Sequence, residues 1–258
     1  MLEFSREIAL AAGSILLKGF RSFDTVVTYK GPSNPVTNID RESEEFLCGR
    51  IRAQYPDHAI VAEEGGSIDR DGEYLWYVDP LDGTTNFAHG VPMFCVSIGV
   101  YSRPLKTVVA GVVYDPFHEE LFTAARGSGA FLNGAPLRVS KTDDLQHALL
   151  ATGFPYDKGT SDDNNLPQFV RVLPQIQCIR RFGSAALDLC YVAAGRLDGY
   201  WEFKLNPWDT AAGSLIVAEA GGVVTTTGGK PFDPVSPEIL VSNGIIHARI
   251  LALLAGAG

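Results

Sequence analysis

The sequence lacks the features of a membrane-spanning or disulfide-bonded protein. No apolar run approaches the ~18 residues that a membrane-spanning helix needs. The apolar stretch at residues 8–17 follows Glu3 and Glu7 and no basic segment precedes it, so we expect an amphipathic helix rather than a signal peptide. None of the four cysteines forms a C-x-x-C pair, which favours free thiols in a reducing compartment. We therefore predict a cytoplasmic protein without a membrane partner.

Positive charge is also scarce. The 21 lysines and arginines face 30 aspartates and glutamates, the formal net charge is -9, and no basic tract occurs. This balance argues against nucleic acid as a partner. An acidic protein that acts on an anionic substrate needs a metal ion to reverse the local field. No repeat is evident, and we expect one domain over residues 1–258, which could divide into an N-terminal metal-site half (1–145) and a C-terminal half (146–258).

Hydrophobic periodicity predicts helices and strands in alternating blocks. We expect a helix over residues 2–20 and a second one that begins at 36–40 and ends near residue 55. Apolar segments separated by turns then predict an antiparallel meander with strands at 95–101, 107–114 and 119–125 and a hairpin at 127–134. Further strands are expected at 148–152, 177–182, 198–203, 222–225 and 239–242, and further helices at 166–173, 184–194, 208–220 and 245–254. Such layers predict an α/β or α+β layered sandwich.

The most informative stretch runs from Tyr74 to Asn86, where an apolar strand ends abruptly in Asp79-Pro-Leu-Asp-Gly83. The fixed φ of proline and the tight turn that Gly83 permits allow the carboxylates of Asp79 and Asp82 to converge. Two adjacent carboxylates raise each other's pKa unless a cation neutralises them, and hard oxygen ligands suit Mg²⁺. The stretch therefore predicts a magnesium site at the tip of a buried strand.

Three further acids stand at the ends of predicted elements. Glu63 ends a short strand, and Asp40 and Asp209 each lie in the first turn of a predicted helix. Each has an ordinary alternative explanation, a solvated loop for Glu63 and helix capping for the two aspartates. With Asp79, Asp82, the Leu81 carbonyl and water, Glu63 and Asp209 supply enough oxygens for at least two Mg²⁺ ions. Sequence distance alone leaves open whether these groups meet.

Together the motifs resemble those of the inositol monophosphatase family, which comprises Mg²⁺-dependent, lithium-sensitive phosphatases related to fructose-1,6-bisphosphatase. Residues 79–86 are similar to its first signature, 61–65 to its strand ending in paired glutamates, and 208–213 to its second signature. Segments 111–114, 129–134 and 181–186 also resemble family segments in the same order, so the resemblance covers nearly the whole chain and is specific. It implies an αβαβα sandwich, a homodimer and a phosphatase.

The resemblance also implies roles for individual residues. It gives a first Mg²⁺ to Glu63, Asp79 and the Leu81 carbonyl, a second to Asp79, Asp82 and Asp209, and a third, weaker ion to the vicinity of Glu63. It also implies that Thr84 and Asp40 orient the water that attacks phosphorus in line, without a phosphoenzyme. Substrate contacts are implied for Asp82, Gly83, Thr84, Gly183, Ser184, Ala185, Glu202 and Asp209, among which Glu202 would bind the hydroxyls of a phosphorylated polyol or sugar.

Several functions fit this resemblance. Hydrolysis of inositol-1-phosphate is the first expectation. A fructose-1,6-bisphosphatase or dual-specificity sugar phosphatase is the alternative, with Lys158, Arg180, Arg181 and Lys204 as candidate partners of a second phosphate. Hydrolysis of 3′-phosphoadenosine 5′-phosphate ranks lower. A non-catalytic regulatory protein on the same fold is the alternative of a different class, and the complete set of acids argues against it.

Overall fold

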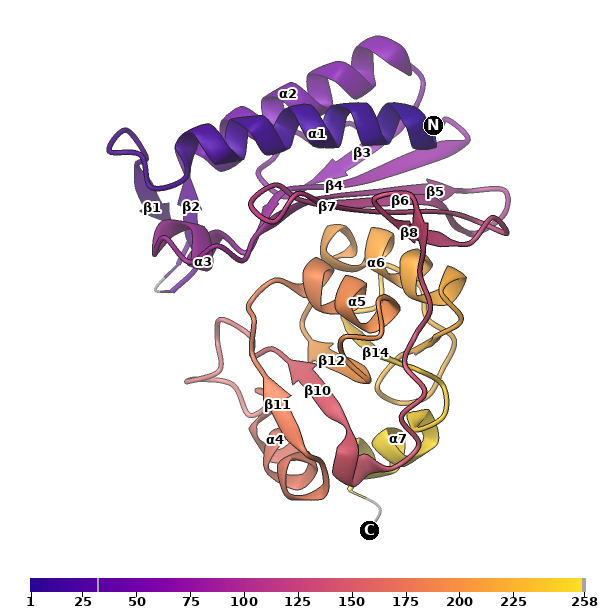
Figure 1. Ribbon diagram of the computed structural model, residues 1–258. Coiled ribbons are helices and arrows are strands. Elements are labelled where there is room, and N and C mark those ends of the chain that lie inside the picture. Colours follow the sequence, from indigo (N-terminus) through magenta and orange to yellow (C-terminus); the bar gives the residue numbers. More distant parts are fainter. Residues whose placement is uncertain (32, 257–258) are drawn as a thin grey trace.

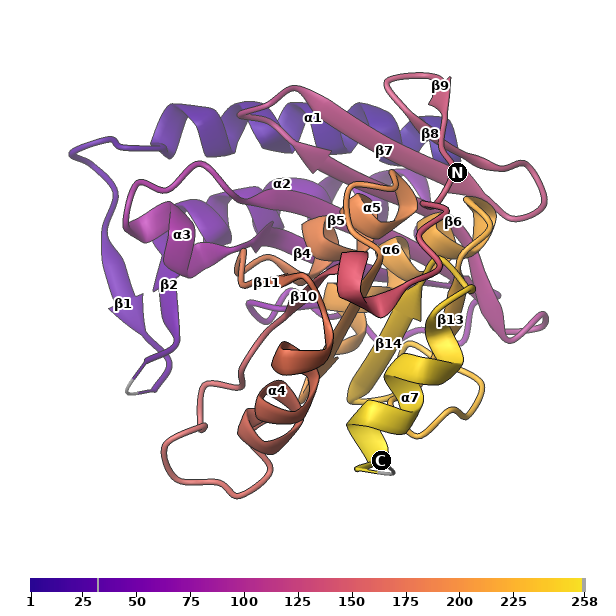
Figure 2. The same cartoon turned by 60° about the horizontal axis from the view of Figure 1, so that its bottom comes forward.

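The computed structural model describes residues 1–31 and 33–256. Two large sheets alternate with three layers of helices (Figure 1), and β1 and β2 form a separate two-stranded sheet. Helices α1 (Leu2–Gly19) and α2 (Asn38–Gln54) cover the outer face of the larger sheet, and α5 (Ala185–Ala193) and α6 (Pro207–Glu219) lie between the sheets. Helices α4 (Leu166–Val172) and α7 (His247–Ala255) cover the outer face of the smaller sheet (Figure 2). The predicted αβαβα sandwich is confirmed.

The larger sheet has seven strands in sequence order. They are β3 (Ala59–Ala62), β4 (Tyr74–Asp82), β5 (Cys95–Ser102), β6 (Thr107–Asp115), β7 (Glu120–Ala125), β8 (Ala130–Leu132) and β9 (Ala135–Pro136). Strand β3 pairs with β4 in parallel, and every later pairing is antiparallel, which confirms the predicted meander. The parallel pair matters for the site because it brings the ends of β3 and β4 to the same edge.

The smaller sheet has five strands, ordered β11-β10-β12-β14-β13. These are β10 (Leu149–Thr152), β11 (Cys178–Arg180), β12 (Gly199–Phe203), β13 (Val223–Thr225) and β14 (Glu238–Ser242). Strand β10 pairs in parallel with β11 and β12, whereas β14 pairs antiparallel with β12 and β13. Short 3-10 turns cover Leu145–His147 and Leu173–Gln175.

Helix α2 begins at Asn38, within the predicted range of 36–40. The strand before it was not predicted: Pro35–Thr37 form β2, which pairs antiparallel with β1 (Val27–Tyr29). Thr37 caps the helix, since its hydroxyl accepts the amides of Ile39 and Asp40. Pro35 lies at the first position of its strand, where the missing amide costs no ladder bond.

The core explains why α6 sits where it does. Two glycines of the larger sheet leave room for its backbone: a Cβ on Gly99 would lie 2.7 Å from the Ala211 methyl, and one on Gly111 would lie 2.7 Å from the Ala212 carbonyl. Small residues on both sides therefore let the helix approach the sheet closely. This packing places Asp209, in the first turn of α6, beside the tip of β4.

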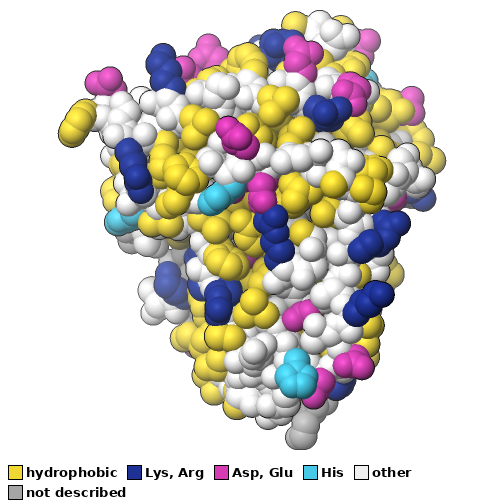
Figure 3. All heavy atoms as spheres, in the orientation of Figure 1, with side chains coloured by type: hydrophobic (Ala, Val, Ile, Leu, Met, Phe, Trp, Pro, Cys, Tyr) yellow, Lys and Arg dark blue, Asp and Glu magenta, His cyan; other side chains and the backbone are white. Residues whose placement is uncertain are grey.

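The remaining predictions concern the cysteines, the membrane, the surface charges and the division of the chain into halves. All four cysteines are free, and Cys48, Cys95 and Cys190 are buried. Within the described part of the chain, no helix is long and apolar enough to cross a membrane. Figure 3 shows acidic and basic side chains interspersed on the face it displays. The division into halves at residue 145 stays a prediction.

Candidate active site

The tip of β4 carries Asp79 and Asp82 on one side because its pairing with β5 is irregular there. Asp79 pairs with Ser97 and Asp82 with Cys95, so β4 has one residue more than its partner between these pairs. An extra residue in a ladder turns a side chain that would otherwise face away. Gly83 follows with a φ of +95°, and a Cβ there would lie 2.7 Å from the Met93 carbonyl. The turn thus requires glycine, as the sequence predicted.

One cavity collects nearly all the residues that the motifs singled out. Its volume is about 170 Å³. It is lined by Glu63, Asp79, Leu81, Asp82, Gly83, Thr84, Gly183, Ala185, Glu202 and Asp209, which come from β3, β4, α5, β12 and α6 or the turns beside them. Asp40 and Ser184 lie behind this lining and contact it through hydrogen bonds. The fold therefore brings together acids that are up to 146 residues apart in the sequence, from Glu63 to Asp209.

Burial raises the pKa of all four lining acids of the expected metal site. It raises the pKa of Glu63 to about 7 and the pKa of Asp79 well above its usual value, where the charges of Glu63, Asp82 and Asp209 add to the effect. The pKa values of Asp82 and Asp209 are raised as well, again mainly by burial. Carboxylates that repel one another in a dry cavity are a suitable donor set for a divalent cation.

The acidic side chains of the cavity are not arranged as a complete set of metal ligands. Among residues 1–31 and 33–256, no three histidine, cysteine, aspartate or glutamate side chains lie close enough together to hold an ion directly. The expected ligand set of Glu63, Asp79, Asp82 and Asp209 also draws on a backbone carbonyl and on water. Their shared cavity, oxygen chemistry and raised pKa values nevertheless fit Mg²⁺, and the Leu81 carbonyl lines the same cavity.

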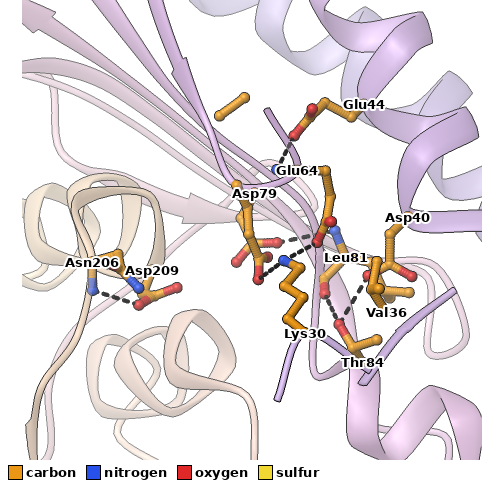
Figure 4. A network of polar contacts seen from close by, with 12 residues as sticks. Lys30, Val36, Asp40, Glu44, Glu64, Asp79, Leu81, Thr84, Asn206 and Asp209 are labelled. Atoms are coloured by element: carbon orange, nitrogen blue, oxygen red, sulfur yellow. Dashed lines mark hydrogen bonds and ion pairs between the residues drawn. The ribbon is translucent and has the colours of Figure 1, made fainter. Parts of the chain in front are cut away.

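Lys30 is a member of the site that the sequence analysis missed. Its Nζ lies 3.2 Å from Glu63 Oε1 and 2.5 Å from Glu64 Oε1, so an ammonium group stands beside the expected metal ligand (Figure 4). The residue follows β1 directly, at the start of the turn-rich loop that leads to α2. Its position at the start of that loop was the only signal in the sequence.

Asp40 and Thr84 form a buried pair next to Leu81. Thr84 Oγ1 lies 3.0 Å from Asp40 Oδ1 and 3.0 Å from the Leu81 carbonyl, both of which accept from it. The other oxygen of Asp40 accepts the Thr37 amide, at 2.9 Å, in a capping box. Burial raises the pKa of Asp40 to about 6. Asp40 therefore caps α2 and accepts a hydrogen bond from the Thr84 hydroxyl at the same time, and its role towards water stays a prediction.

The N-terminus of α5 is directed at Asp82. Ser184, its N-cap, donates its hydroxyl to Asp82 Oδ2 at 2.7 Å, and the Ala186 amide donates to the same oxygen at 2.7 Å. Ser184, which was expected to contact the substrate, thus donates to a carboxylate in this structure, together with the Ala186 amide, which was not predicted. Gly183, with a φ of +85°, and Ala185 still line the cavity.

Asp209 reaches the cavity from the far side. Its Oδ2 accepts the Asn206 amide at 2.7 Å, completing a capping box at the start of α6. Figure 4 shows Asp209 on one side of Asp79, with Asp40 and Thr84 on the other. Helix capping and lining of the cavity are again compatible, because one carboxylate oxygen serves the cap and the other is left for a ligand.

The remaining wall contains groups suited to a hydroxylated or anionic leaving group. Tyr200 donates its hydroxyl to Glu202 Oε2 at 2.6 Å, and burial raises the pKa of Glu202 to about 7. Of the four basic candidates, Arg181 and Lys204 line the cavity and Lys158 and Arg180 do not. Lys204 already contacts Asp157 and Ser161, each at 2.8 Å, which ties it to the loop after β10. That loop adds Phe154, Pro155 and Tyr156 to the wall.

Comparison with known proteins gives consistent results. Residues 1–257 match the profile described as the inositol monophosphatase family. The chain is 46% identical to an inositol-1-monophosphatase from Synechocystis sp., over 98% of this chain and 88% of that protein. It is 48% identical to a Nus factor SuhB from Pseudomonas aeruginosa, over 90% of this chain and 88% of that protein. The solved structure of inositol monophosphatase from Anabaena (Nostoc) sp. superposes with a TM-score of 0.90 at 44% identity, covering 100% of this chain and 96% of that one.

Proposed function

Because the chain belongs to the inositol monophosphatase family and is a phosphoric monoester hydrolase, we propose that it hydrolyses inositol-1-phosphate in a Mg²⁺-dependent reaction. One observation carries the proposal: four carboxylates from three separate parts of the chain line a single cavity beside the Asp40–Thr84 pair. Glu63, Asp79, Asp82, Asp209 and the Leu81 carbonyl would hold two to three Mg²⁺ ions. When bound, the ions supply charge neutralisation and acidify water near phosphorus.

The protein's own residues account for the rest of the reaction. Thr84 lies within hydrogen-bonding distance of Asp40, so this pair can orient a water and take up its proton as the water attacks phosphorus in line. The ester bond between phosphorus and the inositol oxygen breaks as the new bond forms, and the leaving oxygen takes a proton from solvent water. Direct attack needs no cysteine, serine or histidine nucleophile. The Ser184 hydroxyl and Ala186 amide keep Asp82 in a fixed orientation, which limits the reorganisation needed at the moment of reaction.

The leaving-group side supports a polyol as substrate. Glu202 and Tyr200 form a hydrogen-bonded pair at this wall, and a carboxylate accepts hydrogen bonds from ring hydroxyls. Arg181 lines the same cavity and is the observation in favour of the alternative, fructose-1,6-bisphosphate, because a guanidinium pairs well with phosphate.

Phosphate release from three substrates tests the proposal. Inositol-1-phosphate, fructose-1,6-bisphosphate and 3′-phosphoadenosine 5′-phosphate are each assayed with Mg²⁺, with Mg²⁺ plus Li⁺, and with EDTA. We expect Mg²⁺-dependent release that is fastest from inositol-1-phosphate and suppressed by lithium. A higher kcat/KM for fructose-1,6-bisphosphate would instead select the dual-specificity enzyme. Release that persists in EDTA would contradict the metal-dependent reaction.

A second candidate function comes from the relatives named Nus factor SuhB, because the chain is as similar to them as to the inositol-1-monophosphatase. A Nus-factor role need not require hydrolysis. Asp82→Asn separates the two: a strain without this protein should be restored by that variant only if the non-catalytic role is the essential one. Failure of the variant to restore the strain, while the wild-type chain does, would favour the phosphatase.

We also infer that the enzyme acts in the cytoplasm as a homodimer. Four free cysteines support a reducing compartment. The dimer rests on the family resemblance, and the molar mass measured by light scattering tests it. A mass equal to that of one 27.8 kDa chain at micromolar concentration would contradict it.

A further inference from the structure

The direct pairing between the two acid-bearing strands, β3 and β4, ends just before the acids begin. The parallel pairing of β3 and β4 ends at Ala62 and Val78. Glu63 and Asp79, the next residues, therefore lie side by side with no further strand pairing between them. Strand β5 still pairs with Asp79 and Asp82, and Ile60 pairs with Ile68 across the turn after β3, but neither pairing joins the two turns to each other. Contacts from another element are therefore needed to fix the distance between them.

Glu44 provides this support for the turn after β3. It is 5% exposed, and its two carboxylate oxygens accept two amides of the turn: Oε2 accepts Glu64 N at 2.6 Å and Oε1 accepts Gly66 N at 2.7 Å. Figure 4 shows the side chain of Glu44 extending from α2 towards the Glu64 amide. Hydrogen bonds to a carboxylate are about twice as strong as neutral ones. A single buried side chain thus fixes the backbone on both sides of Gly65.

The neighbouring residue of α2 supports the other turn. Ser43 is fully buried, and its hydroxyl donates to the Pro80 carbonyl at 3.0 Å, between Asp79 and Asp82. Asp40, one helical turn earlier, accepts from Thr84. Residues three and four apart share one face of a helix, so Asp40, Ser43 and Glu44 form a polar face of α2 that contacts both acid-bearing turns.

We propose that Glu44, with Ser43, is a positioning residue that sets the affinity of the site for divalent cations, by holding the Glu63 turn against the Asp79 turn. The inference rests on the proposed Mg²⁺-dependent function and extends it to residues outside the cavity lining. Groups that orient metal ligands change metal affinity when they are removed, typically by 10- to 100-fold, even though they do not touch the ion.

The test compares Glu44→Gln with a matched control, Glu45→Gln, on the same helix. Both remove one negative charge, but Glu45 is exposed. A glutamine at position 44 keeps one acceptor oxygen and turns an amide donor towards one of the two N–H groups, so at least one hydrogen bond is lost. Mg²⁺ binding is measured by calorimetry on the apo protein, and the Mg²⁺ dependence of phosphate release is measured alongside it.

We expect Glu44→Gln to weaken Mg²⁺ binding about 10- to 100-fold, and to leave kcat at saturating Mg²⁺ within a few-fold of wild type, because the ligands themselves remain. Glu45→Gln should match the wild type in both. A purely structural role would lower the melting temperature in EDTA without changing the calorimetric affinity of the folded protein. That result would overturn the inference.

Ser43→Ala provides a second test of the inference in case the Glu44→Gln protein does not fold. It removes one hydroxyl and should weaken Mg²⁺ binding by about 2- to 10-fold, the range expected for one hydrogen bond. A wild-type chain that binds no Mg²⁺ would overturn the proposed function and the inference with it. Wild-type binding together with unchanged affinity in every folded variant would overturn the inference alone.

Discussion

The crowding of carboxylates in the cavity makes a sharp prediction about the stability of the metal-free protein. Burial raises the pKa of Glu63 to about 7 from a usual value of 4.5. The folded state therefore binds a proton that the unfolded state has already lost between these two values, and stability must fall as pH rises through this window. Glu63 contributes its stabilisation fully below pH 4.5 and loses it as pH rises through about 7.

The size of the effect follows from the two pKa values. Between pH 5.5 and pH 8, Glu63 alone should cost roughly 2 kcal/mol of unfolding free energy. For a chain of this length, 1 kcal/mol corresponds to about 2–4 °C in melting temperature, so the EDTA-treated protein should melt roughly 4–8 °C lower at pH 8. Asp79 and Asp209, whose pKa values are also raised, act in the same direction.

Thermal unfolding followed by circular dichroism, in EDTA and in excess Mg²⁺, measures this dependence. Mg²⁺ should flatten the pH profile, because a bound cation favours the ionised carboxylates. In EDTA, Glu63→Gln should remove about 2 kcal/mol of the loss in unfolding free energy between pH 5.5 and pH 8. Glu42 is an exposed acid on α2, and Glu42→Gln should leave that loss unchanged. A metal-free protein that is as stable at pH 8 as at pH 5.5, or an unchanged slope in Glu63→Gln, would refute the electrostatic account of the site.

Substitutions at three positions test other parts of the site. Asp82→Asn should lower kcat at least about 100-fold, more than the loss of a residue that only orients a ligand, while leaving the circular dichroism spectrum intact; near-normal turnover would remove Asp82 from the metal site. Thr84→Val breaks the contact with Asp40 and should lower kcat roughly 100-fold, whereas Thr84→Ser keeps the hydroxyl and most of the activity; equal rates for the two variants would exclude the hydroxyl from catalysis. Gly83→Ala forces a side chain into a left-handed conformation against the Met93 carbonyl and should destabilise the fold by about 1–3 kcal/mol in urea titrations, and a smaller change would mean that the turn relaxes.

Local patterns in the sequence accounted for much of the fold. The helical spacing of Ile8, Ala12 and Leu16 predicted the buried face of α1, and the apolar segments between 95 and 125 predicted the meander. Local periodicity suffices in these segments because each one buries a continuous face. It failed at Pro35–Thr37, whose strand depends on pairing with β1 across a loop and has no periodic signal of its own.

The sequence by itself determined the chemistry of the site. The order of residues in Asp79-Pro-Leu-Asp-Gly83 dictates a tight turn with two carboxylates, and Asp40 and Asp209 were predicted to lie in the first turns of helices, where the structure places them. These predictions depend on neighbours in the chain, such as the φ that proline fixes and the amides of a helix start. They could be made without knowing which other segments of the fold pack against these residues.

Only the tertiary structure decided which groups contact one another. The close packing of α6 on Gly99 and Gly111 brings Asp209 to the cavity, the start of α5 is directed at Asp82 rather than at open space, and Lys30 pairs with Glu63. The contact of Glu44 with a turn 20 residues away likewise has no local signature. Such contacts join segments that are distant in the chain, so their distances are set by how the layers pack and not by the spacing of residues.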